Sequence, residues 1–434
     1  MERKMAETDR EDTSIEIRDL EELAKKATSS VQGKLCKKSP WPLVRSIFRV
    51  PKVLRKHNEN AYLPDIVSIG PFHHGKESLE AMEEVKHWYL DALLSRLKSS
   101  QVSTSLESLM TSTALFEEDA RECYAERVNH SHEEFLEMMV VDGCFIIELF
   151  RKREFEGLRD KDDSIFNMSW MIPNLGHDLM LLENQLPWFV LEHLFNQTKD
   201  SDAQPSLAKL AVSFFGFMMP MTVEATPSSL IINKHLLDLL RNCIVATSTS
   251  PSLPAQNTKL DLIPCAIHLL DAGVNFQVST ADNILDIKFS DGVMTIPPLR
   301  IHELTGSVFR NIIAYEQCDC QCTGRITSYA VLLSRLIDSS KDVDLLCREK
   351  ILENWLSPED VSLLFNRLYN DAGVYHFCYD QLCKEVNDYY HTDWPKWRAT
   401  LKRDYFSTPW TVLSFAAAVV LLLLTFIQTL FAVL

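Results

Sequence analysis

The last 24 residues of the sequence, TVLSFAAAVVLLLLTFIQTLFAVL at positions 411–434, contain no charged side chain. At about 1.5 Å of rise per residue, such a helix is roughly 36 Å long and exceeds the hydrocarbon core of a bilayer, which is about 30 Å thick. A helix buried in a soluble protein rarely runs so far without a charge. The stretch therefore predicts a transmembrane helix over residues 409–434, with Pro409 in its first turn and Trp410 at the lipid–water interface.

The residues before this stretch set its expected orientation. Four basic residues precede it: Lys396, Arg398, Lys402 and Arg403. Positively charged flanks stay on the cytosolic side of a membrane, so the N-terminal body is expected in the cytosol, at the plasma membrane or an endomembrane. Because the span is the last segment to be made, we expect insertion after translation, as in tail-anchored proteins. The four basic residues and Trp410 are the predicted membrane-interface residues.

The rest of the sequence has the composition of an acidic folded protein. Hydrophobic residues make up 46% of the chain, enough for a sizeable core. The net charge of −16 argues against nucleic-acid binding, which needs a basic surface. The opening sequence MERKMAETDREDTSIE lacks the apolar segment of a secretory signal, so the 11 cysteines are expected to be reduced thiols. Three glycosylation sequons are interpreted as chance matches: Asn129, Asn167 and Asn196.

Hydrophobic periodicity divides the chain into a flexible arm over residues 1–40 and a mostly helical body over residues 41–405. Apolar residues at spacings of three and four predict an amphipathic helix over residues 77–98, and apolar residues on most sides predict a buried helix over residues 133–150. The sequence Ser-Pro-Glu-Asp at 357–360 predicts the start of another helix. A four-residue repeat also favours a helix: Val343, Cys347, Ile351 and Trp355.

One region alternates with a period of two instead. Every second residue is apolar in VNFQVS, from Val274, and in LDIKF, from Leu285. The residues 290–292, Ser-Asp-Gly, then form a hairpin turn into VMTI. The predicted fold class is therefore mainly α with a small antiparallel β-meander (α+β), plus one C-terminal transmembrane helix.

The sequence IVSIGPFHHGKE contains Gly-x4-Gly-Lys at residues 70–76, which matches the phosphate-binding P-loop up to its last position. A working P-loop wraps phosphates with backbone N–H groups and places a Ser or Thr hydroxyl on Mg²⁺. Here Pro71 has no N–H and Glu77 takes the place of the hydroxyl. The sequence therefore predicts a short extended piece over residues 65–70 and a turn, with no nucleotide and no other cofactor.

Acidic and histidine side chains supply further candidates. His73 and His74 are adjacent, and neighbouring side chains point apart, so they rarely bind one metal. Glu183 lies inside the apolar run LLENQLPWF and suggests a buried catalytic carboxylate, with three possible partners: His177, Asp178 and His193. Pro187 favours a structural interpretation, in which the amides of residues 184 and 185 satisfy backbone groups freed at a helix junction.

Cysteines at every second position form another candidate: Cys318, Cys320 and Cys322. Zinc ligands usually come as two Cys-x₂₋₄-Cys pairs, and the nearest second pair is Cys378 with Cys383. From these patterns we predict no catalytic, cofactor-binding or metal-binding residue.

The segment from Lys34 to Lys56 is rich in basic residues and has no acidic one. An ordinary solvated face explains such a run. The alternative is that the run and the basic residues before the span both lie against the anionic cytosolic leaflet. The basic residues are Lys34, Lys37, Lys38, Arg45, Arg49, Lys52, Arg55 and Lys56.

Five blocks of the sequence occur together: IFRVPKVLRKHNENAYLPDIVSIGPFHHG, MVVDGCFIIELF, DLMLLENQLPWFVLEHLF, IPPLRIHELTGSVFRNIIAYEQC and ITSYAVLLSRLIDSSKDVDLLCREKIL. Together they resemble the plant family known as domain of unknown function 247 (DUF247, UPF0481-like membrane proteins). The resemblance runs from about residue 45 to the end. It implies a single-pass plant membrane protein without known catalytic residues. Some members are linked to pollen–stigma self-incompatibility in grasses, which suggests recognition or signalling.

The uncharged span and its basic flank predict a tail-anchored, single-pass membrane protein, and the resemblance implies a plant protein that acts by binding an unknown protein partner, with a suggested role in recognition or signalling. It contacts membrane lipid through its C-terminal span, and neither nucleic acid nor nucleotide is expected. One alternative is a membrane-bound enzyme with a carboxylate or metal site around His73, His74, Glu183 or the 318–322 cysteines. A second alternative is a purely structural membrane adaptor.

Overall fold

The computed structural model describes residues 22–35, 45–99, 104–199, 204–219, 232–246, 261–281, 283–374, 376–392 and 409–433. The chain divides into two units, Met1–Arg45 and Ser46–Leu434. In the first unit, the described part is a helix over residues 22–32 with every residue exposed. Most of the predicted arm lies outside the described residues, so its flexibility stays a prediction.

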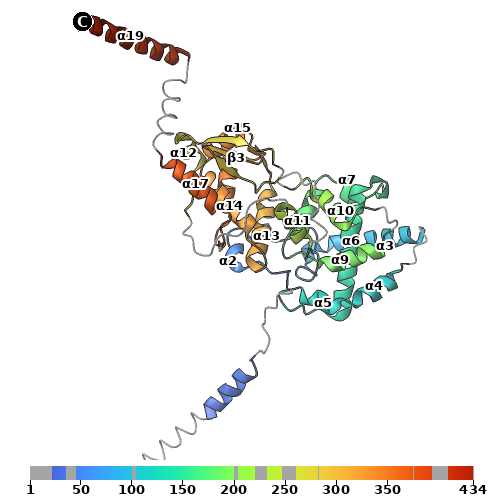
Figure 1. Ribbon diagram of the computed structural model, residues 1–434. Coiled ribbons are helices and arrows are strands. Elements are labelled where there is room, and N and C mark those ends of the chain that lie inside the picture. The colour runs from blue at the N-terminus through green and yellow to red at the C-terminus, as the bar shows by residue number, and fades with distance from the viewer. Residues whose placement is uncertain are drawn as a thin grey trace, which may run out of the picture. The chain divides into compact units, whose positions relative to one another are not determined.

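One long helix organises the first half of the second unit (Figure 1). This is α6 (His132–Glu154), which begins with a capping box between Ser131 and Glu134. Every residue from 138 to 152 is buried, which confirms the buried helix predicted there. Gly143 lets α9 come close, because a Cβ at this position would lie 2.4 Å from Leu194 Cδ1. The helices that contact α6 are α3 (Ala81–Ser99), α4 (Leu106–Ala114), α5 (Glu117–Glu122), α9 (Trp188–Gln197) and α10 (Leu207–Phe215).

Short elements fill the rest of this half. They are α2 (Lys52–Arg55), η1 (Glu59–Tyr62), η2 (Glu77–Leu79), η3 (Glu156–Leu158), α7 (Ser164–Asn167) and α8 (Met171–Leu179). The amphipathic helix predicted over residues 77–98 corresponds to η2 and α3, which places buried leucines on one side of α3.

In the second half, α11 and α13 lie near the middle of the body, and the other labelled helices lie on the side away from α6 (Figure 1). Its helices are α11 (Leu236–Ala246), α12 (Ala266–Asp271), α13 (Thr305–Cys318), α14 (Arg325–Leu336), α15 (Ser340–Arg348), α16 (Pro358–Asn366) and α17 (Asp380–Tyr390). α16 begins as its sequence predicts, because Ser357 accepts a hydrogen bond from the N–H of Asp360 and Pro358 stands at the first helical position. A single hydrophobic cluster extends through both halves, from Ile47 to Val386.

The strands form two small sheets rather than an antiparallel meander. β2 (Lys288–Ser290) and β3 (Val293–Ile296) make the predicted hairpin around Asp291 and Gly292, both with positive φ. β1 (Asn275–Val278) instead pairs parallel with β3, on the side away from β2, so the meander prediction was wrong. β4 (Leu299–Ile301) and β5 (Leu352–Asn354) form a separate parallel pair.

The backbone before β2 explains why LDIKF is not one strand. The side chain of Asn283 accepts a hydrogen bond from the N–H of Leu285 at 2.7 Å, and the Tyr379 hydroxyl donates to the Leu285 carbonyl at 2.8 Å. The N–H and the carbonyl of Leu285 are therefore bonded to side chains and are not free to pair with β1. The fold class is nevertheless confirmed as mainly α with a small β part.

The helix expected through Val343 and Trp355 ends early. After α15, Lys350 adopts a left-handed conformation with φ 61°. Its N–H bonds to the Cys347 carbonyl, and the N–H of Ile351 bonds to the Leu346 carbonyl, which is a Schellman end. The chain then enters β5, and Trp355 is exposed.

A separate long helix, α19 (Pro409–Val433), follows the body. Its segment Leu413–Leu430 is long and apolar enough to cross a membrane, and none of that segment is buried. Trp410 lies in the first turn and is exposed. The other predicted interface residues lie outside the described part of the chain: Lys396, Arg398, Lys402 and Arg403.

A buried polar network as the candidate functional site

The segment over residues 65–70 runs from the exposed Asp65 to the buried residues 67–70 and pairs with no described strand. Its backbone bends at residues 65, 66 and 70, so the continuous extended piece predicted there does not form. The Asp178 carboxylate accepts three consecutive backbone N–H groups of this segment. The distances are 2.9 Å from Asp65, 2.8 Å from Ile66 and 2.9 Å from Val67. Consecutive N–H groups of a strand point in alternate directions, so their convergence on one carboxylate shows a bent backbone that forms a small anion-binding concavity. The Asp178 side chain supplies the partners that these backbone donors need.

The end of the same segment is held by two further side chains. Asn184 accepts from the N–H of Ile69 at 2.8 Å and donates to the Val67 carbonyl at 3.1 Å. Asp142 accepts from the N–H of Gly70 at 2.8 Å. Gly70 has φ 69°, and a Cβ there would lie 2.7 Å from the Gln185 carbonyl oxygen. Only glycine fits this position without strain.

Lys86 balances the charge of Asp142. Its ammonium lies 2.7 Å from Asp142 Oδ1 and 2.7 Å from Glu83 Oε1, and it also donates to the Ser68 carbonyl. Burial lowers the pKa of Lys86, but the two carboxylates outweigh burial and raise it. A fully buried lysine therefore stays charged and fixes the segment from its other side.

The sequence ENQ holds the junction between α8 and α9, as the structural interpretation predicted. Gln185 Nε2 donates to the carbonyls of Leu179 and Leu181, both at 2.8 Å. Asn184 Nδ2 donates to the Asp178 carbonyl at 2.9 Å. The carbonyls of Asp178 and Leu179 end α8, Leu181 follows the helix, and α9 starts at Trp188, directly after Pro187. The amides therefore satisfy backbone groups freed where the chain leaves one helix and enters the next.

Glu183 is fully buried and faces basic groups. It accepts from the N–H of Val50 at 2.6 Å and from the Arg55 guanidinium, and its second oxygen lies 3.5 Å from Arg49 Nη1. His73 Nε2 lies 3.6 Å from that same oxygen, beyond hydrogen-bond distance. The carboxylate therefore ties residues 49–55 to the start of α9 and has no water-exposed oxygen for acid–base chemistry.

His73 is poorly suited to act as a base. Lys76 Nζ lies 2.7 Å from His73 Nδ1, so the neutral ring carries its proton on Nε2, toward Glu183. Burial, then the charges of Lys76 and the two arginines, lower the pKa of His73 to about 3. The same contact turns the lysine of the Gly-x4-Gly-Lys sequence toward the protein interior. His74 is exposed, and its ring packs edge-on against His130. His193 lies apart from Glu183, with Nε2 3.0 Å from the Ser112 hydroxyl.

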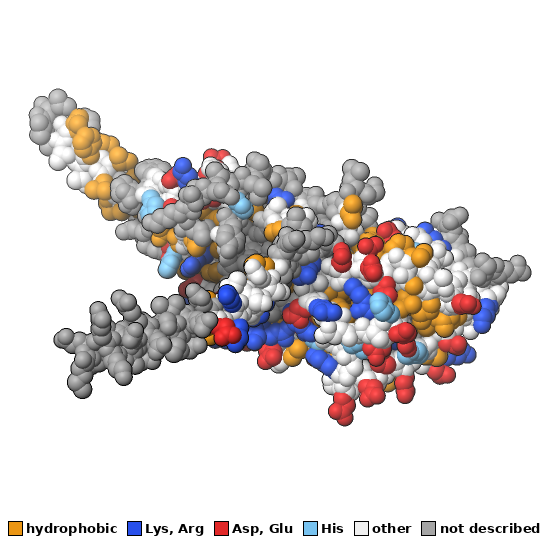
Figure 2. Space-filling model, turned by 90° about the horizontal axis from the view of Figure 1, so that it is seen from below, with side chains coloured by type: hydrophobic (Ala, Val, Ile, Leu, Met, Phe, Trp, Pro, Cys, Tyr) orange, Lys and Arg blue, Asp and Glu red, His pale blue; other side chains and the backbone are white. Residues whose placement is uncertain are grey.

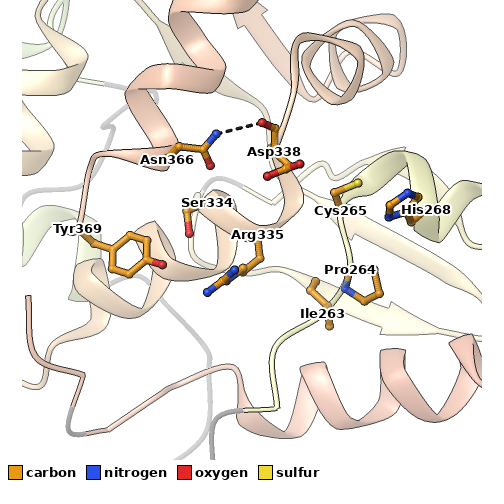
Figure 3. A pocket seen from close by; sticks show the side chains of 9 residues that line it. All are labelled: Ile263, Pro264, Cys265, His268, Ser334, Arg335, Asp338, Asn366 and Tyr369. Atoms are coloured by element: carbon orange, nitrogen blue, oxygen red, sulfur yellow. Dashed lines mark hydrogen bonds between the residues drawn. The ribbon is translucent and has the colours of Figure 1, made fainter. Parts of the chain in front are cut away.

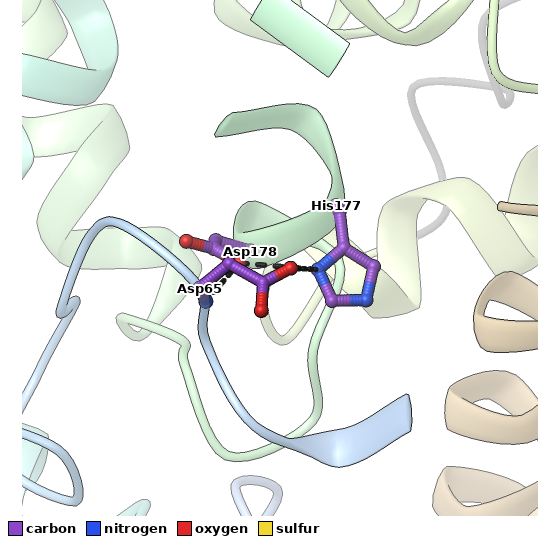
Figure 4. A group of neighbouring side chains, drawn as sticks. All are labelled: Asp65, His177 and Asp178. Atoms are coloured by element: carbon purple, nitrogen blue, oxygen red, sulfur yellow. Dashed lines mark hydrogen bonds and ion pairs between the residues drawn. The ribbon is translucent and has the colours of Figure 1, made fainter. Parts of the chain in front are cut away.

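Within the described ranges, the side chains with metal-ligand spacing are Asp65, His177 and Asp178, whose ligand atoms lie within 4.8 Å of one another (Figure 4). Asp178 Oδ1 already interacts with the N–H of Asp65 and with His177 Nδ1 at 3.1 Å. Its Oδ2 accepts the other two N–H groups. A carboxylate offers about four lone-pair sites, so a cation would have to displace one of these partners.

The cysteines singled out by spacing are not part of that group. Cys320 is exposed, while Cys318 and Cys322 are partly buried. Burial, followed by the neighbouring Asp319, raises the pKa of Cys318 to about 12, and burial raises the pKa of Cys322 to about 12. Both are therefore thiols rather than thiolates at neutral pH when no metal is bound.

Part of the basic run forms ion pairs with acidic residues of the body, at the surface for Arg49 and Lys56 and with a buried carboxylate for Arg55. Arg49 lies 2.8 Å from Glu126, Arg55 pairs with Glu183, and Lys56 lies 2.7 Å from Asp371. These residues are therefore not available together for a lipid surface. Lys37 and Lys38 lie outside the described residues.

Two surface features have no signal in the sequence, because distant segments form them. The first is a cavity of about 320 Å³ between α12, α14 and α16 (Figure 3). Its lining includes Ser334, Arg335, Tyr369 and His268, and Asn366 Nδ2 donates to the Asp338 carbonyl at its edge. Such a lining suits a small polar molecule, but no buried charged side chain faces it, so we assign it no reaction.

The second feature is an apolar groove of about 330 Å³ between α3, α4 and α6, called here the α3–α4–α6 groove. Its apolar lining is Leu90, Leu106, Met110, Leu136 and Val141, and its rim is His87, Glu133 and Glu137. Figure 2 shows hydrophobic side chains gathered among acidic, basic and histidine side chains on one face of the molecule.

The fold and the network define a mainly helical body in which side chains bond the backbone of residues 65–70, and one additional helix able to cross a membrane. The chain belongs to DUF247, a family described as plant protein of unknown function, whose sequence profile matches residues 47–424. It is 31% identical to the UPF0481 protein At3g47200 of Arabidopsis thaliana, over 89% of this chain and 86% of the relative. It is 23% identical to the putative UPF0481 protein At3g02645 of Arabidopsis thaliana, over 88% and 89%. No solved structure matches the chain.

Proposed function

We propose that the chain is a single-pass membrane protein whose body, residues 45–392, lies in the cytosol and acts by binding another protein rather than by catalysis. Support for the span comes from α19, an uncharged helix of 25 residues whose described side chains are exposed. Support for the orientation comes from the four basic residues between positions 396 and 403.

The observation that carries the binding role is the α3–α4–α6 groove. Its floor is apolar, its rim carries Glu133 and Glu137, and Leu106 at its edge is 41% exposed. A groove of this kind fits an amphipathic helix that presents leucine-like side chains to the floor and lysine or arginine to the rim. We therefore propose such a basic amphipathic helix as the part of the partner that binds.

A matched pair of variants tests the groove. Leu106 and Leu115 are both exposed leucines at the two ends of α4, but only Leu106 lines the groove. The probe is a fluorescent helical peptide of leucine and lysine, added to the full chain in lipid nanodiscs and followed by anisotropy. We expect Leu106→Lys to weaken binding at least tenfold and Leu115→Lys to leave it within twofold.

Equal effects of the two substitutions would contradict the groove as the binding site. A second peptide with glutamate in place of lysine checks the charge complementarity, and it should bind more weakly than the lysine peptide. Equal affinity for both peptides would also contradict the proposal.

The orientation has its own test, independent of the groove. In sealed microsomes the cytosolic surface faces outward, so protease added outside should remove an N-terminal tag. Protection of the tag until detergent is added would overturn the cytosolic placement of the body. Insertion after translation stays a prediction.

What supports binding over catalysis is the use of the candidate carboxylates. Asp178 bonds to the backbone N–H groups of residues 65–67, and Glu183 bonds to that of Val50. Catalytic carboxylates instead need an oxygen within reach of a substrate.

A further inference from the structure

The polar side chains of the segment Leu413–Leu430 within α19 share one face of the helix. These residues are Ser414, Thr425, Gln428 and Thr429. At about 100° per residue, the four fall within an arc of roughly 100° around the helix axis. The remaining described side chains of the segment Leu413–Leu430 are apolar. Polar residues scattered evenly around the helix would leave no large part of its circumference purely apolar.

The same face carries a seam with the spacing of packed membrane helices. Successive steps of four and three residues connect Ser414, Ala418, Leu421, Thr425 and Gln428. This is the period of about 3.5 residues that keeps one side of a helix against a partner. Most residues of the seam are small, which lets two backbones approach closely in a membrane.

The two threonine hydroxyl groups on this face are satisfied within the helix, but the carboxamide is not. Thr425 Oγ1 donates to the Leu421 carbonyl at 2.8 Å, and Thr429 Oγ1 donates to the Thr425 carbonyl at 2.7 Å. Gln428 makes no such bond within the described part of the chain and lies on an exposed face. Its side chain brings two donors and an acceptor that hydrocarbon cannot satisfy.

The depth of Gln428 keeps water away from it. The residue lies seven positions past Leu421, the middle of α19, or about 10 Å along the axis. That is inside the half-thickness of the hydrocarbon core, roughly 15 Å. Helical side chains lean toward the N-terminus, so this carboxamide leans toward the middle of the bilayer rather than toward the nearer surface.

We propose that two copies of this chain associate in the membrane through this face of α19, with the two Gln428 carboxamides hydrogen-bonded to each other. The inference rests on the proposed membrane span. Copies inserted the same way bring their Gln428 residues to one depth, and a carboxamide is both donor and acceptor, so it is complementary to itself across a two-fold axis.

The test measures association of the full chain in phosphatidylcholine vesicles, with donor or acceptor dyes at the N-terminus. Energy transfer should exceed the random level and fall when unlabelled chain is added. Gln428→Leu should weaken association about three- to thirty-fold, the range for a hydrogen bond between membrane helices. Gln428→Asn, which keeps a carboxamide, should retain it.

A double variant of unchanged composition, Gln428→Leu with Leu430→Gln, moves the carboxamide about 160° around the helix. Donor-labelled wild type mixed with acceptor-labelled double variant should show no more energy transfer than donor-labelled wild type mixed with acceptor-labelled Gln428→Leu. The inference is wrong if Gln428→Leu does not weaken association, or if the double variant restores energy transfer.

Flotation of the vesicles separates this inference from the proposed function. Wild type that floats but shows only random transfer overturns the pairing and leaves the span intact. Wild type that does not float overturns both the span and the pairing.

Discussion

Asp178 shows what a single side chain does in this body. Its carboxylate accepts three consecutive N–H groups of residues 65–67 while it is itself fully buried. Asp178→Asn turns one acceptor oxygen into a donor that faces backbone donors. We expect a loss of about 2–4 kcal/mol in the free energy of unfolding, measured with urea on the full chain in mild detergent.

The control for this substitution is Asp65→Asn, because the Asp65 side chain is 63% exposed and contributes its backbone rather than its carboxylate. It should change the free energy of unfolding by less than about 0.5 kcal/mol. The same samples test the metal interpretation of the Asp65–His177–Asp178 group. A chelator should leave the wild-type unfolding midpoint unchanged, and a drop that zinc reverses would show that the group is a metal site.

Gly70 and Gly75 offer a matched comparison of backbone strain and steric contact. Both have positive φ, 69° and 74°, but a Cβ meets the Gln185 carbonyl oxygen at 2.7 Å only at Gly70, and nothing within 4 Å at Gly75. Gly75→Ala should cost about 1 kcal/mol from φ alone, and Gly70→Ala about 3 kcal/mol. Urea unfolding measures both, and equal costs would mean that the contact at Gly70 relaxes freely.

His73 makes stability depend on pH in a defined direction. Its pKa is lowered from 6.5 to about 3 in the folded protein, so the unfolded chain binds the proton more readily. Its contribution is complete above pH 6.5 and is lost as the pH falls toward 3. Between pH 6 and 4.5, wild type should lose about 2 kcal/mol more than His73→Gln.

The exposed neighbour provides the control for this titration, since His74→Gln should follow the wild-type pH profile. The measurement is the free energy of unfolding at a series of pH values for all three proteins. Parallel profiles for wild type and His73→Gln would show that His73 titrates normally in the folded state.

At the scale of elements, the segment over residues 65–70 has its backbone N–H groups bonded to side chains rather than to a neighbouring strand. Amide hydrogens of Ile66, Val67, Ile69 and Gly70 should therefore exchange as slowly as those of a sheet, although no strand adjoins them. Hydrogen exchange read by mass spectrometry checks this. Asp178→Asn should speed amide exchange at residues 65–67 more than at Gly70. Asp142→Asn should speed exchange at Gly70 more than at residues 65–67.

Exchange at the rate of a free loop in wild type would contradict the role assigned to these side chains. Simultaneous release of the whole segment by either substitution would instead show that it opens as one cooperative unit. In that case the separate anchoring of its two ends would be wrong.

Elements with a repeating local signal were predictable. The helical period and the capping sequences gave α3, α6 and α16, and the Asp-Gly turn gave the β2–β3 hairpin. The two errors involve contacts between distant segments: β1 chose β3 as a parallel neighbour, and β5 interrupted a helical period to pair with β4. The hydrophobic period of a segment does not show which distant segment its strand will pair with.

The polar network was predictable only in part, for the same reason. An amide run before Pro187 indicated a helix junction, and Gln185 and Asn184 hold one. The partner at Gly70 is Asp142, one of two acids inside the buried run of α6, and that local anomaly was a usable signal. Nothing local indicated that Asp178 would bond to residues 65–67, because 111 to 113 positions separate them.

At the scale of the whole molecule, the body contains its own core and α19 adds nothing to it. The hydrophobic cluster ends at Val386, and no part of the segment Leu413–Leu430 is buried. Residues 45–392 expressed alone should therefore fold, stay soluble and be monomeric. Their free energy of unfolding should lie within about 0.5 kcal/mol of that of the full chain in detergent, and they should not float with vesicles.

Sedimentation of this fragment also locates any self-association. A monomeric body beside a paired full chain places the pairing outside residues 45–392, in α19 or in the helix over residues 22–32, and Gln428→Leu separates these two cases. A dimeric body would place an interface on the body itself, and the energy transfer expected for the full chain would then survive Gln428→Leu. A fragment that aggregates, or unfolds several kcal/mol earlier, would show that α19 packs against the body and completes its core rather than lying in lipid.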